Sequence, residues 1–192
     1  MAYDICKEVT DMNHEKLLIS ERIDEVKMMC DREHPIYEQI SCFSIALYVI
    51  GYFNCADLMS FDDVDTTEAG CILKEDFTEI TEEELPSEYN ILESPDKYLF
   101  VFGDPIFPEH FAVLTDTRSE KPFFSKLRFF GSGFDSLEEL KSEYLGKDGV
   151  GYNDLHYFKK KRSDAFNSSS FGKIYTIKDD GSCAVYRNET SK

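Results

Sequence analysis

The ten residues from Cys42 to Gly51, CFSIALYVIG, constrain the fold more than any other part of the sequence. They are apolar on all sides, as in a buried helix or a buried strand. The length of the run and its terminal glycine favour a helix, which Ser41 would cap at its N-terminus. Even when it is extended to Phe53, the run is too short to cross a bilayer, which needs about 20 apolar residues. We therefore predict a core helix that the rest of the chain must cover, with Cys42 in its first turn.

The segments on either side of this run show helical and strand patterns. From Asn13 to Cys30 apolar side chains recur at steps of three and four, which predicts an amphipathic helix. Lys97 to Phe102 is aromatic and branched and ends at a Gly-Asp-Pro turn, which predicts a central strand. Three further elements are expected: neighbouring antiparallel strands at His110–Leu114 and Phe123–Leu127, and a helix with a capping box that begins at Asp135 and ends at Gly146. Together they predict an α+β fold in which N-terminal helices pack on an antiparallel sheet.

Composition divides the chain into unequal parts. Residues 1–165 are expected to form a single α+β domain, because 192 residues leave little room for a second full domain. Within it, the stretch around 56–94 is acidic and lacks apolar periodicity, so we expect an irregular, exposed insertion there. Residues 166–192 contain a serine-rich run and then hairpin signals around Asp179-Asp180-Gly181, which predict a linker and a C-terminal β-hairpin.

The net charge is strongly negative. Asp and Glu number 38 and Lys and Arg number 21, so the formal charge is -17. A field of this sign repels phosphate backbones and anionic lipid headgroups, which argues against nucleic-acid and membrane-surface binding. It favours a protein partner or substrate with a basic surface. The plain alternative is a solvated acidic surface that keeps the protein in solution.

Six cysteines are spread along the chain without a CxxC pair, and the first residues show no basic segment followed by an apolar one. Reduced thiols and the lack of a secretory signal predict a cytoplasmic protein, in its own cell or in a host cell. No metal or cofactor is expected, because the four histidines form no zinc pattern and Gly131-Ser132-Gly133 is not a nucleotide-binding loop. The oligomeric state stays open.

Cys42 and His110 are the residues that could form a thiol site. A helix N-terminus lowers the pKa of a cysteine, and a nearby imidazole stabilises the thiolate further. His110 heads a strand that follows later in the chain, which is the order of cysteine and histidine in papain-like folds. The alternative is structural, because free cysteine is among the most buried residue types, and His110 would then be a surface or hydrogen-bonded histidine.

A thiol site also needs a group that orients the imidazole and a donor to the oxyanion. Ser125 or Lys126 on the following strand would orient it, depending on the register, and Asp116 in the intervening turn is the other option. The returning strand contains no Asn or Asp, which weakens a complete triad. Gln39 would donate to the oxyanion if its loop folds toward Cys42, and otherwise it is a surface residue.

Several segments resemble a group of uncharacterised bacterial proteins. The group's pattern is roughly Asn-Cys, a small apolar helix to glycine, a His-headed strand and a Ser-Lys-Leu strand. It is matched here by residues 41–51, 110–113 and 123–127, and residues 140–152 resemble the group's closing segment. Ser41 replaces the usual asparagine. The group looks papain-like in the order of its cysteine and histidine, so the resemblance implies a papain-like arrangement with thiol hydrolase, deamidase or transferase chemistry.

Two functions therefore stand as hypotheses. The first is a cysteine hydrolase or amidase, such as a bacterial effector, that acts on a basic protein or peptide with Cys42 as nucleophile and His110 as base. The second is a non-catalytic acidic interaction protein, such as an immunity protein or an inhibitor, that covers a basic functional site. A thiol within hydrogen-bond reach of the imidazole favours the enzyme, and a buried Cys42 without that contact favours the binding protein.

Overall fold

The computed structural model describes residues 2–33, 40–53, 55, 57–162, 173–177 and 183–187. The chain divides into two compact units, Met1–Lys161 and Arg162–Lys192. In the second unit, β7 (Lys173–Ile177) and β8 (Cys183–Arg187) pair antiparallel, with Tyr175 opposite Val185. Cys42 and His110 both belong to the first unit.

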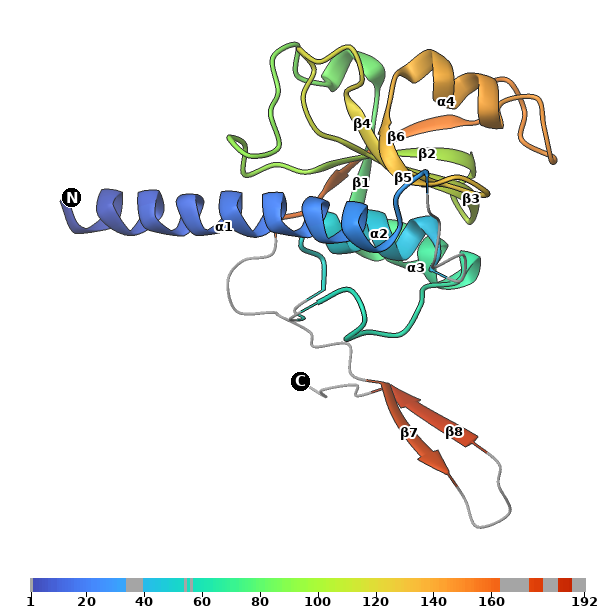
Figure 1. Cartoon of the computed structure of the whole chain (residues 1–192), viewed down its shortest axis with the longest axis horizontal. Helices are drawn as coiled ribbons and strands as arrows, with labels where there is room; N and C mark the ends of the chain where they lie inside the picture. Colours follow the sequence, from blue (N-terminus) through green and yellow to red (C-terminus); the bar gives the residue numbers. More distant parts are fainter. Residues whose placement is uncertain are drawn as a thin grey trace. The chain divides into compact units, whose positions relative to one another are not determined.

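The first unit is an α+β fold built on a six-stranded antiparallel sheet (Figure 1). The strand order is β1-β6-β2-β3-β4-β5. The strands are β1 (Phe77–Ile80), β2 (Tyr98–Asp104), β3 (Phe107–Leu114), β4 (Phe123–Leu127), β5 (Gly131–Asp135) and β6 (Leu155–Lys160). The helices are α1 (Ala2–Met29), α2 (Cys42–Val49), α3 (Thr66–Asp76) and α4 (Leu137–Tyr144), with a short 3-10 helix, η1 (Glu82–Glu84). The predicted α+β class, with helices on an antiparallel sheet, is confirmed.

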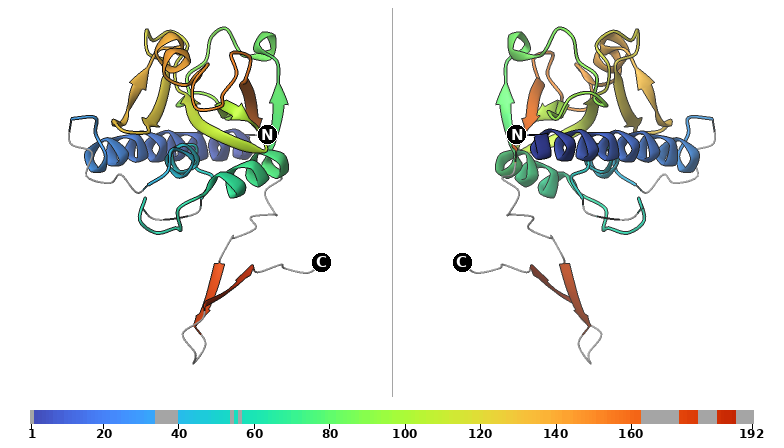
Figure 2. Two further views of the ribbon diagram at one scale, coloured as in Figure 1. Left: turned by 90° about the vertical axis from the view of Figure 1, so that its right-hand side faces the viewer. Right: turned by 90° about the vertical axis from the view of Figure 1, so that its left-hand side faces the viewer.

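The sheet separates α4 from the N-terminal helices. In Figure 1, α2 and α3 lie below the sheet and α4 lies above it, and both views of Figure 2 show α1 passing beneath the sheet. Neighbouring residues of a strand point to opposite faces. Phe111 on β3 packs edge-to-face against Phe43 of α2, with ring centroids 4.8 Å apart, whereas His110 stacks on Tyr144 of α4. These are called the α2 face and the α4 face.

α2 lies at the centre of the core, and all its residues from Phe43 to Val49 are buried. Ser41 caps the helix by accepting a hydrogen bond from the Ser44 amide at 3.0 Å, as the sequence predicts. The buried Ser44 hydroxyl donates to Asp63 and accepts from the Val64 amide at 2.8 Å. The connection to α3 is thereby tied to the first turn of α2, and this turn is where the candidate thiol lies.

The acidic stretch around 56–94 contains α3, β1 and η1, so the expectation of an irregular insertion is wrong for these residues. α3 begins with a capping box, in which Asp65 accepts from the Glu68 amide at 2.8 Å and Glu68 accepts from the Asp65 amide at 3.3 Å. Gly70 lets α3 approach the β2–β3 turn, because a Cβ there would lie 2.1 Å from the Ile106 carbonyl oxygen. α3 buries only a narrow strip, which explains why its apolar residues show no clear period.

The chain covers the β5 edge of the sheet with its own backbone. Directly after α1, the Cys30 carbonyl accepts a hydrogen bond from the Ser132 amide at 2.7 Å. Arg32 then forms an ion pair with Asp135, whose side chain is 3% exposed. The edge strand is therefore partly covered by the chain itself, which limits strand pairing with another protein.

Candidate functional site

Cys42 lies where β3 and β4 separate. The two strands pair at Val113 and Leu114 of β3 and no further toward Cys42. The thiol donates to the Glu109 carbonyl oxygen at 3.9 Å, and the Phe111 amide favours the charged form of the thiol. The thiol thus satisfies a main-chain carbonyl of β3 that lies beyond the residues paired with β4.

His110 lies between Glu109 and Phe111, but its side chain points to the other face. The imidazole stacks on the Tyr144 ring with 4.2 Å between centroids and 12° between planes. The next residue, Phe111, packs instead on Phe43, the neighbour of Cys42. Because adjacent strand residues point to opposite faces, the imidazole lies on the α4 face and Cys42 approaches from the α2 face. In the described structure no hydrogen bond joins Cys42 to His110, so the expected nucleophile–base pair is not assembled.

Burial controls the protonation of the Cys42 thiol. Part of the residue reaches the surface, but the sulfur is enclosed, and its desolvation raises the pKa from 9.0 to about 11. The Phe111 amide, the Lys126 ammonium group and the amides of the first turn of α2 lower this pKa and do not offset the burial. The thiol is therefore protonated at neutral pH, whereas nucleophilic attack requires the thiolate.

Burial also keeps the imidazole neutral. His110 is 1% exposed, and desolvation, followed by the charge of Lys126, lowers its pKa from 6.5 to about 3. Its Nε2 atom is buried and finds no hydrogen-bond partner in the part of the chain that the structure describes. An imidazole with so low a pKa is a weak general base, because the ideal catalytic pKa lies near the working pH.

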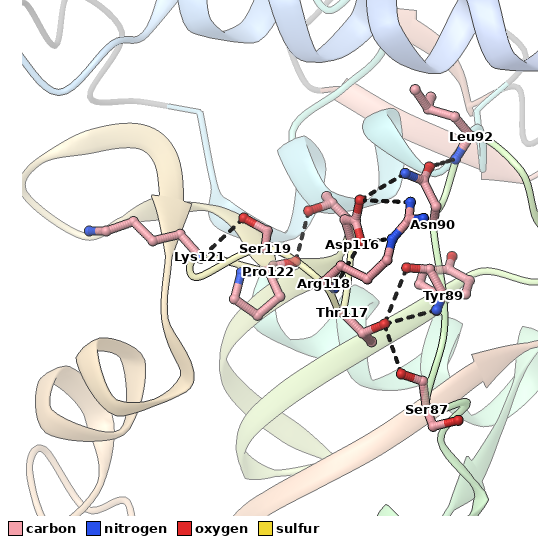
Figure 3. Close-up of polar contacts among 11 residues, drawn as sticks. Ser87, Tyr89, Asn90, Leu92, Asp116, Thr117, Arg118, Ser119, Lys121 and Pro122 are labelled. Atoms are coloured by element: carbon pink, nitrogen blue, oxygen red, sulfur yellow. Dashed lines mark hydrogen bonds and ion pairs between the residues drawn. The ribbon is translucent and has the colours of Figure 1, made fainter.

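Asp116 lies in the turn between β3 and β4, two residues beyond the end of β3 (Figure 3). Its carboxylate accepts hydrogen bonds from Asn90 Nδ2 at 2.9 Å, the Arg118 amide at 2.9 Å and Arg118 Nε at 3.1 Å. These contacts, the Arg118 side chain first, lower the pKa of Asp116. Asp116 therefore stabilises the turn and does not orient the imidazole, which corrects the expected role.

Ser125 and Lys126 are both buried on β4. Ser125 Oγ donates to Asp135 at 3.5 Å and forms no hydrogen bond with His110, so it does not orient the imidazole. The charge of Lys126 acts on both the Cys42 thiol and His110. A cation at this position disfavours a protonated imidazole, which a thiolate–imidazolium pair would require.

Tyr144 is the residue of this region to which the sequence assigned no role. It ends α4, within the helix that the sequence predicts between Asp135 and Gly146, and its ring covers the imidazole. The sequence places Tyr144 in a helix, but the contact with His110 depends on how α4 packs on the sheet. Gln39, expected to donate to an oxyanion, lies outside the described residues.

A pocket of about 60 Å³ adjoins Tyr144. It is lined by Glu109, Arg128, Phe129, Glu143, Tyr144, Lys147, Asp148 and Val150. Cys42 and His110 are not among these residues, so the pocket does not bring a substrate to the thiol. Within the described ranges, no group of three or more His, Cys, Asp or Glu residues could hold a metal ion, and no helix is long and apolar enough to cross a membrane.

Comparison with known proteins gives no match to this chain. No family model, no curated protein and no solved structure is similar to it. Its function must therefore be inferred from the candidate site and from the distribution of charge.

Proposed function

We propose that this chain is a non-catalytic acidic interaction protein, such as an inhibitor or an immunity protein, that binds a partner protein at a basic surface. One observation carries the proposal. The protonated Cys42 thiol is bonded to the main chain of β3, while His110 faces α4 on the other side of the sheet. Both residues then stabilise the fold, and the charged surface is left to carry the function.

The negative charge is concentrated in one span of the chain. Between Ile40 and Asp96 there are 14 acidic residues and one basic residue, Lys74. This span contains α3, the edge strand β1 and η1, and all three glutamates of η1 are exposed. Exposed acidic groups with few cations among them attract a basic protein surface and accelerate its association.

Two fluorescent peptides with the same length and amphipathic pattern test the proposal, one made of leucine and lysine and the other of leucine and glutamate. We expect the protein to bind the Leu/Lys peptide, and the affinity to fall as salt is raised, because surface charges are screened beyond about 8 Å at physiological ionic strength. Fluorescence anisotropy measures both effects. Equal binding of the two peptides, or no binding of the Leu/Lys peptide, would contradict the proposal.

A papain-like cysteine hydrolase or amidase is the second candidate. It is favoured by the position of Cys42, which receives main-chain N–H groups at a helix N-terminus, an arrangement that lowers a thiol pKa. For this function His110 would have to leave Tyr144 and turn to the α2 face, where it would act as the base. The substrate would be a basic protein or peptide. For either function we propose a cytoplasmic location, in the protein's own cell or in a host cell.

A further inference from the structure

Most of the exposed large hydrophobic side chains gather in three turns. Among the residues whose side chains the structure describes, eight large hydrophobic residues are exposed. Five of them lie at the β2–β3 turn, the β4–β5 turn and the α4–β6 connection and are between 53% and 80% exposed: Ile106, Phe107, Phe129, Phe130 and Tyr152. Contiguous exposed apolar surface is uncommon on monomeric proteins and marks interaction sites.

The antiparallel order brings these three turns to one end of the sheet. β2 and β4 end there, and β3, β5 and β6 begin there. Arg128 links the β4–β5 turn to the other two turns, because it donates to Glu109 of β3 at 3.2 Å and to Asp148 in the α4–β6 connection at 3.1 Å. In the α4–β6 connection, the Tyr152 ring lies against Gly146. The three turns thus form one surface, which we call the turn surface.

The pocket of about 60 Å³ opens in the turn surface. Its walls include the rings of Phe129 and Tyr144 together with three acidic and two basic side chains. Both charged ends of the Arg128 guanidinium are held by carboxylates, and Lys147 lies 3.8 Å from Glu143. A pocket of this size can receive the end of one partner side chain, with aromatic rings and carboxylates on its walls.

We propose that the turn surface is where the basic partner docks, an inference that rests on the proposed function. Phe129 and Phe130 provide the apolar contacts, and the carboxylates around them contact Lys or Arg side chains of the partner. Among the accessible charged side chains of the three turns and their flanking residues, five are acidic, Asp104, Glu109, Glu143, Asp148 and Asp154, and two are basic, Arg128 and Lys147, whereas Lys126 is buried. A second copy of the chain would bring a charge of -17 against the same charge, so a basic protein fits this surface better.

The test uses the Leu/Lys peptide and two double variants of the full chain. Phe129→Ser with Phe130→Ser removes two rings from the turn surface, and Met28→Ser with Met59→Ser removes exposed apolar side chains elsewhere. We expect the first variant to bind the peptide at least about 30-fold more weakly, as the loss of an interface hot spot does. The methionine variant should bind within about twofold of the wild type. All four side chains are exposed, so both variants should fold, which urea unfolding checks.

The possible results separate the docking site from the function. If the Phe129/Phe130 variant binds the Leu/Lys peptide as tightly as the wild type, the turn surface is not the docking site, and the basic-partner function still stands. An equal loss of peptide affinity in both variants would also overturn the turn surface as the docking site, because any exposed apolar side chain would then contribute to binding. If the wild type does not prefer the Leu/Lys peptide to the Leu/Glu peptide, the proposed function fails and the docking site fails with it.

Discussion

Replacement of Gly70 by alanine is expected to lower the free energy of unfolding by about 2 kcal/mol, although alanine is the better helix former. In an open helix the same change stabilises by about 1 kcal/mol. In α3 the new Cβ would lie 2.1 Å from the carbonyl oxygen of Ile106 and 2.8 Å from its carbonyl carbon. Both atoms belong to the main chain, so α3 or the β2–β3 turn must move, and overpacking of this kind costs about 1–3 kcal/mol or more.

Urea unfolding followed by circular dichroism measures this change, with Cys71→Ala as the control on the same helix. Cys71 is exposed, so its replacement should change the free energy of unfolding by less than about 0.5 kcal/mol. The contact also supports the turn that presents Ile106 and Phe107 on the turn surface. A Gly70→Ala protein that is as stable as the wild type would show that α3 does not pack against this turn.

Replacement of His110 by phenylalanine is expected to remove part of the pH dependence of stability. The imidazole has a pKa of about 3 in the folded chain and about 6.5 in the unfolded chain. The unfolded state therefore binds the proton first, so this residue destabilises the fold as pH falls from about 6.5 toward 3. Between pH 7 and pH 5 the loss is about 2 kcal/mol, because only the unfolded chain is protonated in that range.

Phenylalanine is the appropriate substitution because it keeps a ring against Tyr144 and leaves no cavity in the α4 face. Free energies of unfolding, measured in urea at pH 7, 6 and 5, give the slope of stability against pH for the wild type and for His110→Phe. The wild type should lose about 2 kcal/mol more than His110→Phe over this range. Parallel curves for the two proteins would mean that His110 is protonated in the folded state, and that it is not buried as a neutral ring.

The sequence predicts α2 and the central strands well, because their signals are local. The run from Cys42 to Gly51 is apolar on all sides, and Ser41 supplies the side-chain acceptor that starts the helix. β2 is likewise recognisable from its aromatic and branched residues, although it runs two residues further than predicted, to Asp104, before the turn. By contrast, α3 was not predicted, because its position depends on the contact of Gly70 with a distant turn.

The candidate site was predictable only as a set of residues. Sequence places Cys42 at a helix N-terminus and His110 on a later strand, and the structure has both there. The imidazole occupies the α4 face because its neighbour Phe111 packs on α2, and the thiol contacts depend on where β3 and β4 separate. Neither feature leaves a pattern in a single sequence, because both arise from tertiary packing.

The measurement that tests the central claim most directly is the rate of iodoacetamide alkylation at each cysteine as a function of pH, in the wild type and in His110→Ala. Cys71 is the internal control, because it is an exposed thiol. With a pKa of about 11, Cys42 should react more slowly than Cys71 at pH 7, with no inflection near neutral pH. Faster alkylation of Cys42 than of Cys71 near pH 6, lost in His110→Ala, would show an activated thiolate. That result would contradict the non-catalytic account and favour the cysteine hydrolase in its place.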